Sequence, residues 1–229
     1  MTRQPFMKGK IAEVFESVQG EGIYLGEKQL FVRFFGCNLN CKYCDTHPEC
    51  FREYEPQELI KELKRFDDHY HSVSFTGGEP LLQKDFLKEA LGLAARENFT
   101  TYLETNGTIP EHLEEVIDYV HIISMDVKLP SSTGLKHYWE RHRDFFKIAS
   151  RREVFVKAVV CSSTQEEDIM EAVRMIRETN RSAVLVLQPN YFEDGREMRK
   201  KLRRMRDRCI RHRVTACIIP QMHKVAWLR

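Results

Sequence analysis

Three of the seven cysteines lie within one short stretch, directly after an apolar run that is typical of a strand. Cys37, Cys41 and Cys44 have the spacing C-x3-C-x2-C. Thiolates this close in sequence can converge on one inorganic centre with little extra ordering of the backbone. A four-iron cluster held by only three cysteines keeps one iron without a protein thiolate, and that iron could take a small chelating ligand.

Two other interpretations of these cysteines compete with an iron–sulfur cluster. A tetrahedral zinc site needs four Cys or His ligands, and Cys50 or His47 could supply the fourth. The cysteines could also be small buried residues, although three of them so close together make that reading weak. The cysteine spacing alone therefore leaves iron and zinc open.

Length and composition fit one globular α/β domain that spans residues 1–229. Charged residues make up 31% of the chain and hydrophobic residues 42%, which is ordinary for a soluble protein. The formal net charge of +2 gives no overall attraction to nucleic acid.

The beginning of the chain lacks the apolar core of a signal peptide, and no run approaches the length of a membrane span. We therefore expect a cytoplasmic protein with reduced thiols. Cys161, Cys209 and Cys217 fall in periodic apolar segments, and we expect all three to fill the core.

Strand and helix patterns alternate along most of the chain. Helices of ten or more residues between strands call for a parallel sheet with right-handed crossovers. About six βα units can be counted, so we expect an incomplete (βα)6-type parallel barrel. The expected strands are 11–18, 30–35, 73–76, 100–103, 121–127, 154–160, 183–187 and 214–219, and the main expected helices are 54–71, 86–94, 110–117, 138–148, 165–179 and 196–213.

Polar and glycine-rich segments follow the expected strands in unit after unit. They are the cysteine stretch, Gly77-Gly78-Glu79-Pro80, Glu104-Thr105-Asn106-Gly107, the segment around Asp126 and Lys128, and Gln188-Pro189-Asn190. Chemistry on parallel sheets is found at the carboxyl ends of the strands. The pattern therefore predicts one composite site at that edge.

The cysteine triplet and the later GGEP segment together resemble the radical S-adenosylmethionine superfamily. This resemblance implies that the three cysteines hold a [4Fe-4S] cluster. It also implies that the methionyl amine and carboxylate of S-adenosylmethionine chelate the fourth iron, with the GGE segment at the amine.

A narrower resemblance covers nearly the whole chain. The segments Gln19-Gly20-Glu21-Gly22, Cys44-Asp45-Thr46, Glu104-Thr105-Asn106-Gly107 and Gln221-Met222-His223-Lys224 resemble the 7-carboxy-7-deazaguanine synthase family, as do Arg33 and Ser124-Met125-Asp126-Val127-Lys128. The implied activity is that of a lyase of queuosine and 7-deazapurine biosynthesis. It converts 6-carboxy-5,6,7,8-tetrahydropterin to 7-carboxy-7-deazaguanine with release of ammonia, through a 5′-deoxyadenosyl radical that is used catalytically.

The resemblance also implies roles for single residues, and no side chain is expected to act as an acid or base. Magnesium is expected at Thr46, S-adenosylmethionine at Gly78, Glu79, Ser124, Asp126 and Gln188, and the pterin at Val18, Gln19, Gly20, Arg33 and Thr76. Arg33 can grip the substrate carboxylate through two parallel hydrogen bonds. Glu21 and Glu104 can accept hydrogen bonds from the pterin's amino and ring N–H groups.

Two departures from the family pattern limit this transfer. Many members have Ser-Pro-Lys where this chain has Ser124-Met125-Asp126, so Lys128 becomes a candidate for the role of the displaced lysine. Some members use the chain terminus in substrate binding, and the sequence leaves the role of the segment Trp227-Leu228-Arg229 open. The family further implies an external one-electron reductant and a homodimer, with no membrane or nucleic-acid partner.

Two rival functions remain open at this point. Another radical S-adenosylmethionine protein, such as an activase of a second protein, would often carry extra cluster cysteines, and Cys50 is the only spare cysteine nearby. A zinc-stabilised module could instead bind RNA through the basic segment 196–213. Met198, Leu202, Met205 and Cys209 repeat at helical spacing in that segment, which favours an outer helix with a solvated basic face.

Overall fold

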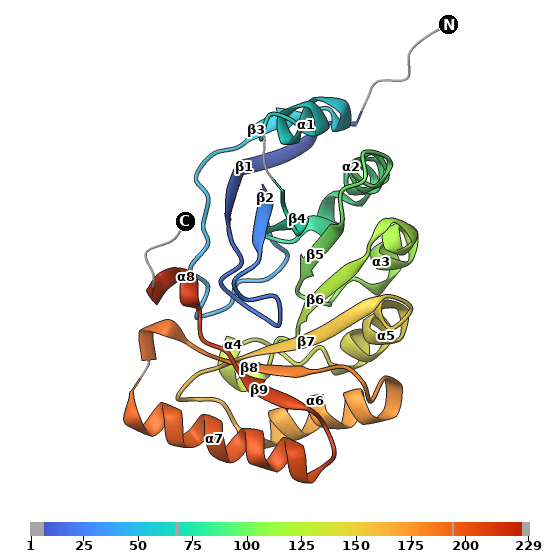
Figure 1. The fold of residues 1–229 in the computed structure, drawn as a ribbon. Helices are drawn as coiled ribbons and strands as arrows, with labels where there is room; N and C mark the ends of the chain where they lie inside the picture. The colour runs from blue at the N-terminus through green and yellow to red at the C-terminus, as the bar shows by residue number, and fades with distance from the viewer. Residues whose placement is uncertain (1–6, 67–68, 194, 226–229) are drawn as a thin grey trace, which may run out of the picture.

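A computed structural model describes residues 7–66, 69–193 and 195–225. Within these residues nine strands form one sheet in the order β3-β1-β2-β4-β5-β6-β7-β8-β9 (Figure 1). β1 pairs antiparallel with β2 and with β3, and every other pairing is parallel. The strands are β1 (Gly9–Val18), β2 (Lys28–Phe34), β3 (Arg52–Tyr54), β4 (Ser72–Gly77), β5 (Thr101–Thr105), β6 (Ile122–Asp126), β7 (Glu153–Val160), β8 (Leu185–Pro189) and β9 (Ala216–Ile218).

Helical crossovers join the parallel strands from β2 to β9. The α-helices are α1 (Pro56–Leu63), α2 (Lys84–Arg96), α3 (Pro110–Val116), α4 (Pro130–Thr133), α5 (Trp139–Ala149), α6 (Glu166–Thr179), α7 (Arg196–Arg211) and α8 (Met222–Val225), and the 3-10 turns are η1 (Pro80–Gln83), η2 (Ile117–Tyr119) and η3 (Tyr191–Glu193). The sheet ends at β3 and β9, which do not pair with each other. The predicted incomplete parallel barrel is therefore confirmed.

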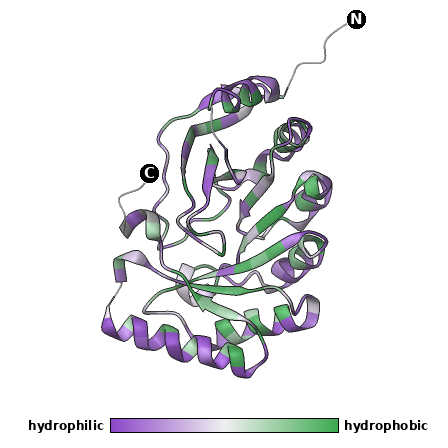
Figure 2. Cartoon of the chain, in the orientation of Figure 1, coloured by the Kyte–Doolittle hydropathy of each residue, from purple (hydrophilic) through white to green (hydrophobic). Residues whose placement is uncertain are grey.

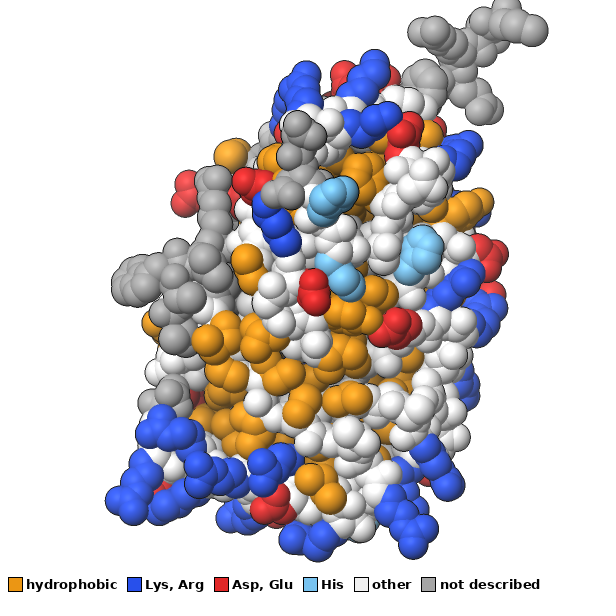
Figure 3. Space-filling view, in the orientation of Figure 1, with side chains coloured by type: hydrophobic (Ala, Val, Ile, Leu, Met, Phe, Trp, Pro, Cys, Tyr) orange, Lys and Arg blue, Asp and Glu red, His pale blue; other side chains and the backbone are white. Residues whose placement is uncertain are grey.

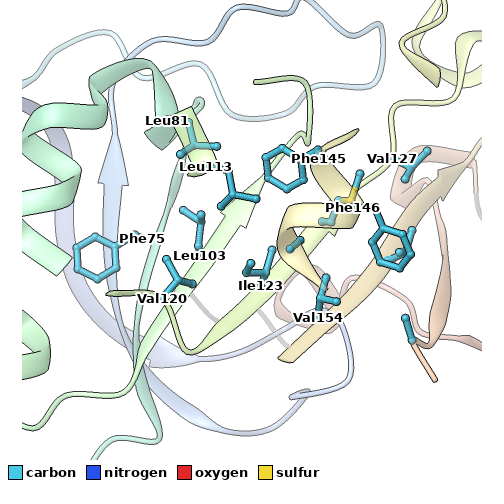
Figure 4. Close-up of a cluster of buried hydrophobic side chains, with 14 of the residues drawn as sticks. Phe75, Leu81, Leu103, Leu113, Val120, Ile123, Val127, Phe145, Phe146 and Val154 are labelled. Atoms are coloured by element: carbon cyan, nitrogen blue, oxygen red, sulfur yellow. The ribbon is translucent and has the colours of Figure 1, made fainter. Parts of the chain in front are cut away.

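The main core lies between the sheet and the helices on its outer side. Figure 4 shows apolar side chains of β4, β5 and β6 meeting those of α3 and α5, such as Leu103, Leu113, Ile123 and Phe146. The helices are amphipathic, with green apolar stripes toward the strands and purple polar faces outward in Figure 2. This packing on the outer face leaves the strand ends free to carry polar side chains.

The basic segment at the end of the chain forms the amphipathic helix α7. Met198, Leu202, Met205 and Cys209 are buried against the core, as their spacing predicts. Lys and Arg side chains gather along the lower edge of the molecule, over this helix, in Figure 3. No helix of the described chain is both long and apolar enough to cross a membrane.

Two local predictions were wrong. The helix expected over 54–71 is limited to Pro56–Leu63, and Tyr54 lies in β3, where it pairs with Gly9 of β1. This pairing joins residues far apart in sequence, and the charged and polar run after Leu63 offers only Phe66 and Tyr70 to a continued apolar stripe. Cys217 is only half-buried beside a small apolar cluster, whereas Cys161 and Cys209 are buried as expected.

The turn after β4 approaches the backbone of the cysteine loop very closely. The N–H of Gly78 donates to Phe34 O at 3.0 Å, and the N–H of Glu79 donates to Gly36 O at 2.8 Å. A Cβ atom added at Gly78 would lie 1.9 Å from Gly36 O, so only glycine fits there. Gly77 also needs glycine, because its φ is +115°.

The Gly78→Ala variant should unfold at a lower urea concentration than the wild type. We expect a loss of about 1–3 kcal/mol in the free energy of unfolding, because the two backbones must move apart. Gly92→Ala in α2 is the matched control, since its added Cβ would meet Tyr119 at an ordinary 3.5 Å. This control should gain up to about 1 kcal/mol from helix propensity. Equal stability of both variants would contradict the close approach.

Candidate functional site

One cavity of about 370 Å³ lies at the carboxyl ends of the parallel strands. The three cysteines line it, together with residues from β1, β2, β4, β5, β6, β7, β8 and the last described segment. The predicted site residues found in its wall are Val18, Gln19, Gly20, Glu21, Arg33, Cys37, Cys41, Cys44, Thr46, Thr76, Gly78, Glu104, Ser124, Asp126, Lys128 and Gln188. The strand ends thus bring together the expected set except Glu79.

The loop that carries the cysteines is held by three other segments. Glu79 N–H binds Gly36 O, as described above, and the N–H of Lys42 donates to Thr133 O at 3.0 Å. Asn38 accepts a hydrogen bond from Asn106 Nδ2 at 2.8 Å. These contacts come from the turn after β4, from the end of α4 and from the turn after β5. The loop is therefore ordered by the sheet edge and not by its own sequence alone.

The three thiols fit a shared inorganic centre by their placement and their chemistry. Burial raises the pKa of Cys37 and raises the pKa of Cys41 to about 11, whereas the nearby Lys128 lowers both. A bound cation would favour the thiolates that burial disfavours. In the described parts of the chain no three His, Cys, Asp or Glu side chains are already grouped as metal ligands. The three cysteines are thus candidate ligands that line the same cavity.

Glu79 is the predicted residue that does not line the cavity. Its side chain is fully buried, and its carboxylate accepts from Leu81 N at 3.2 Å, Thr105 Oγ1 at 2.9 Å and Asn106 N at 2.7 Å. Its carboxylate oxygens are therefore used within the protein. The contact expected between Glu79 and the methionyl amine remains a prediction, and the geometry gives Glu79 the task of joining the turns after β4 and β5.

Glu104 stands at the end of β5 in a network of polar side chains. Its Oε1 accepts from Gln19 Nε2 at 3.0 Å and from Ser74 Oγ at 3.1 Å, and its Oε2 accepts from Thr76 Oγ1 at 3.0 Å. Gln19 Nε2 also donates to Gln29 Oε1 at 3.0 Å. This network joins β1, β2, β4 and β5, and it fixes the direction in which Gln19, Thr76 and Glu104 face the cavity.

A second group of polar side chains lies at the end of β6 and beside the middle of β7. Lys128 Nζ is 2.9 Å from Asp126 Oδ2, and Lys157 Nζ is 3.7 Å from the same oxygen. Lys157 also forms an ion pair with Glu21. Asp126 Oδ1 and Gln188 Oε1 are buried in the cavity wall and have no hydrogen-bond partner among the residues that the structure describes. Two unsatisfied acceptors at this place fit a ligand that carries N–H or O–H donors.

Arg33 projects from β2 into the cavity beside β1. Its Nε donates to Glu13 Oε2 at 3.1 Å, and its guanidinium lies over the Phe15 ring at 5.5 Å. The pair with Glu13 is partly exposed and therefore weak. The guanidinium is thus placed at the wall by an aromatic face and one carboxylate, with donors to spare for an anionic ligand.

The end of the described chain closes the cavity on the side of the cysteine loop. Lys224 forms an ion pair with Asp45, next to Thr46, and Gln221 Nε2 donates to Glu21 Oε1 at 2.8 Å. Burial raises the pKa of Asp45, but the hydrogen bond and the positive charge of Lys224, together with the hydrogen bond from Thr46, outweigh it and hold the pKa below its usual range. Figure 1 shows α8 beside the loop between β2 and β3, in agreement with these contacts.

Several residues of the wall had no individual role assigned from the sequence, although most belong to segments named there. They are Tyr43, Asp45, Thr105, Asn106, Lys157, Asn190, Gln221 and Lys224. Lys157 had a readable signal, because a lysine within the apolar run 154–160 must find a buried partner. His47 is absent from the wall, and the side chain of His223 and the segment Trp227-Leu228-Arg229 lie outside the described residues.

Glu79 should make the folded protein sensitive to pH. Burial raises its pKa to about 7 from 4.5, so the folded state holds a proton that the unfolded state has lost. This stabilisation is fully present below about pH 4.5 and is lost as the pH rises through about 7. Urea unfolding should show the wild type losing up to about 3 kcal/mol more than Glu79→Gln across this window. Parallel pH curves for the two proteins would refute the assignment.

One family model and several known proteins match the sequence of this chain. The family model of the radical SAM superfamily matches residues 31–205. A 7-carboxy-7-deazaguanine synthase of Geobacter sulfurreducens is 39% identical over 203 residues, which cover 79% of this chain and 81% of the relative. A 7-carboxy-7-deazaguanine synthase of Archaeoglobus fulgidus is 34% identical over 240 residues, covering 97% of this chain and 100% of the relative.

Solved structures agree on the fold. The crystal structure of QueE from Escherichia coli matches with a TM-score of 0.66 at 20% identity, and the match covers 92% of this chain and 93% of that one. A structure of TYW1 with a lysine-pyruvate adduct matches with a TM-score of 0.59 at 15% identity, covering 81% and 75%. The family model and the curated relatives favour an enzyme over the zinc-stabilised module considered as a rival. The chain is an enzyme of the radical SAM superfamily and, within it, belongs to the 7-carboxy-7-deazaguanine synthase family.

Proposed function

We propose that this enzyme converts 6-carboxy-5,6,7,8-tetrahydropterin to 7-carboxy-7-deazaguanine and ammonia, in queuosine or 7-deazapurine biosynthesis. One observation carries the proposal. A single cavity holds the three cysteines on one side and, on the other, the hydrogen-bonding groups expected for a carboxylated pterin. This arrangement supports a reaction in which a cofactor at the cysteines meets a small ligand directly.

The cofactor side consists of the cysteine loop and the ends of β4, β6 and β8. The cluster would be a [4Fe-4S] centre held by Cys37, Cys41 and Cys44. A reduced cluster of this kind supplies radical chemistry when S-adenosylmethionine is bound to it, by passing one electron to S-adenosylmethionine. The unsatisfied oxygens of Asp126 and Gln188 suit the donor groups of S-adenosylmethionine. Lys128 adds a buried positive charge beside the thiols.

The substrate side consists of β1, β2 and β5. Glu104 and Gln19 present a fixed carboxylate and amide to the cavity, which suit the amino and ring N–H groups of a pterin. Arg33 suits the carboxylate of the substrate, because a guanidinium binds a carboxylate through two parallel N–H groups. Val18, Gly20 and Thr76 complete the wall.

Magnesium is part of the same proposal. Thr46 lines the cavity, and its hydroxyl donates to Asp45 Oδ1 at 3.1 Å, so oxygen atoms of two residues lie together there. A hard cation that keeps several waters would suit these oxygens and those of the substrate. We further propose a cytoplasmic homodimer that takes its electron from an external reductant.

An anaerobic assay tests the function. The cluster is reconstituted and reduced, S-adenosylmethionine, magnesium and 6-carboxytetrahydropterin are added, and products are read by mass spectrometry. A deazaguanine carboxylic acid formed over many turnovers, without matching loss of S-adenosylmethionine, is the expected result. Accumulation of 5′-deoxyadenosine while the pterin survives would leave the radical chemistry standing and overturn the substrate.

Binding of iron should depend on the cysteines that line the cavity and not on Cys50, which lies nearby in the sequence. Cys41→Ala should lose the brown iron–sulfur chromophore and most of the bound iron, because one thiolate of the cluster is removed. Cys50→Ala is the matched control, since Cys50 is exposed and lies outside the cavity wall, and it should keep both. Stoichiometric zinc in the wild type, or equal iron in both variants, would count against the cluster.

Arg33 should recognise the carboxylate of the substrate. Arg33→Lys should weaken binding of 6-carboxypterin about 10- to 100-fold, because lysine cannot make the bidentate contact. Binding of pterin without the carboxyl group should change little, and pterin fluorescence can follow both titrations. Arg52→Lys, at an exposed pair outside the cavity, serves as the control. An equal loss for both pterins would show that Arg33 serves the fold instead.

A further inference from the structure

Lys157 is a buried lysine in the middle of an apolar strand. Its neighbours Val156 and Ala158 belong to the main core, so the alternation of β7 turns Lys157 to the opposite face, where it lines the cavity. An amine at such a depth is costly unless its charge is paired. The strand therefore carries a charge that core packing alone does not explain.

Carboxylates from different segments surround this amine. Lys157 pairs with Glu21 of the loop after β1 and lies 3.7 Å from Asp126 Oδ2 at the end of β6. Glu104, at the end of β5, adds electrostatic attraction. Burial by itself would lower the pKa of Lys157, but these carboxylates outweigh it and raise the pKa above its ordinary value. Lys157 is thus a fixed cation.

Each of the two contacted carboxylates belongs to a different part of the proposed site. Glu21 is on the pterin side, where Gln221 Nε2 binds its Oε1 at 2.8 Å and Lys157 binds its Oε2. Asp126 is on the cofactor side, where Lys128 and Lys157 share Oδ2, while the buried Oδ1 has no hydrogen-bond partner in the described part of the chain. One amine therefore fixes acceptors for two ligands.

We infer that Lys157 is a positioning residue that orients Glu21 for the pterin and Asp126 for S-adenosylmethionine at the same time. The inference rests on the proposed function of the site. Without the amine, the two partly buried carboxylates would lose their shared cation, so that Glu21 would keep Gln221 and Asp126 would keep Lys128 as the partners named above. Each carboxylate would then be held by fewer contacts and would turn toward water or other donors or take up a proton. Lys157 then sets the affinity for both ligands without taking part in the chemistry.

Separate binding titrations test this inference on the reconstituted enzyme with its cluster kept oxidised. Lys157→Met should weaken 6-carboxypterin and S-adenosylmethionine each by about 10-fold or more, measured with the other ligand absent. Lys157→Arg keeps the charge and should recover most of that loss. Lys200→Met, at an exposed lysine of α7, is the control for loss of one positive charge and should bind both ligands as the wild type does.

A double-mutant cycle separates action through Glu21 from a general structural effect. If Lys157 acts on the pterin through Glu21, the double variant with Glu21→Gln and Lys157→Met should bind 6-carboxypterin as tightly as whichever single variant binds it more weakly. Lys157→Gln, which can still donate a hydrogen bond, replaces Lys157→Met if that protein does not fold. Unchanged binding of both ligands by the neutral variants, or fully additive losses, would overturn the inference. Failure of the wild type to bind 6-carboxypterin would instead refute the proposed function.

Discussion

The site depends on the contact between the turn after β4 and the backbone of the cysteine loop. The N–H of Glu79 binds Gly36 O just before Cys37, while its carboxylate binds Asn106 N in the turn after β5. Asn106 in turn holds Asn38 of the cysteine loop. Glu79 thus joins the turn after β4, the cysteine loop and the turn after β5, and all three must be in place before the thiols can face one cavity. The absence of a side chain at Gly78 is what allows the approach.

Electrostatics imposes the second constraint, because several partly buried carboxylates line the cavity. Asp126 is paired with Lys128 and Lys157, and Glu104 is satisfied by neutral donors instead of a cation. Buried charges persist in proteins when they are paired or hydrogen-bonded. The pairing leaves a few acceptors unsatisfied, and those acceptors are where a ligand with donors gains most.

The sequence predicts the barrel and the position of the site because both follow from local patterns. Helical and strand periodicity define the βα units, and strand ends in a parallel sheet must lie at one edge. The apolar run around Lys157 signals a buried amine, but the partners of that amine cannot be read from the sequence because they are carboxylates of distant segments. The direction of Glu79 is likewise invisible, since its motif is the same whether the carboxylate faces a ligand or the next turn. The start of α1 at Pro56, after Tyr54 has paired with Gly9, depends on the long-range pairing of β3 with β1.

The central claim is that the cofactor at the cysteines and the pterin share one cavity in direct contact. Deuterium transfer measures that contact, because a hydrogen atom moves only between groups that touch. With 6-carboxytetrahydropterin deuterated at C6, we predict deuterium in the 5′-methylene of the S-adenosylmethionine recovered after many turnovers. Formation of the deazaguanine product with no deuterium in the recovered S-adenosylmethionine would contradict the account.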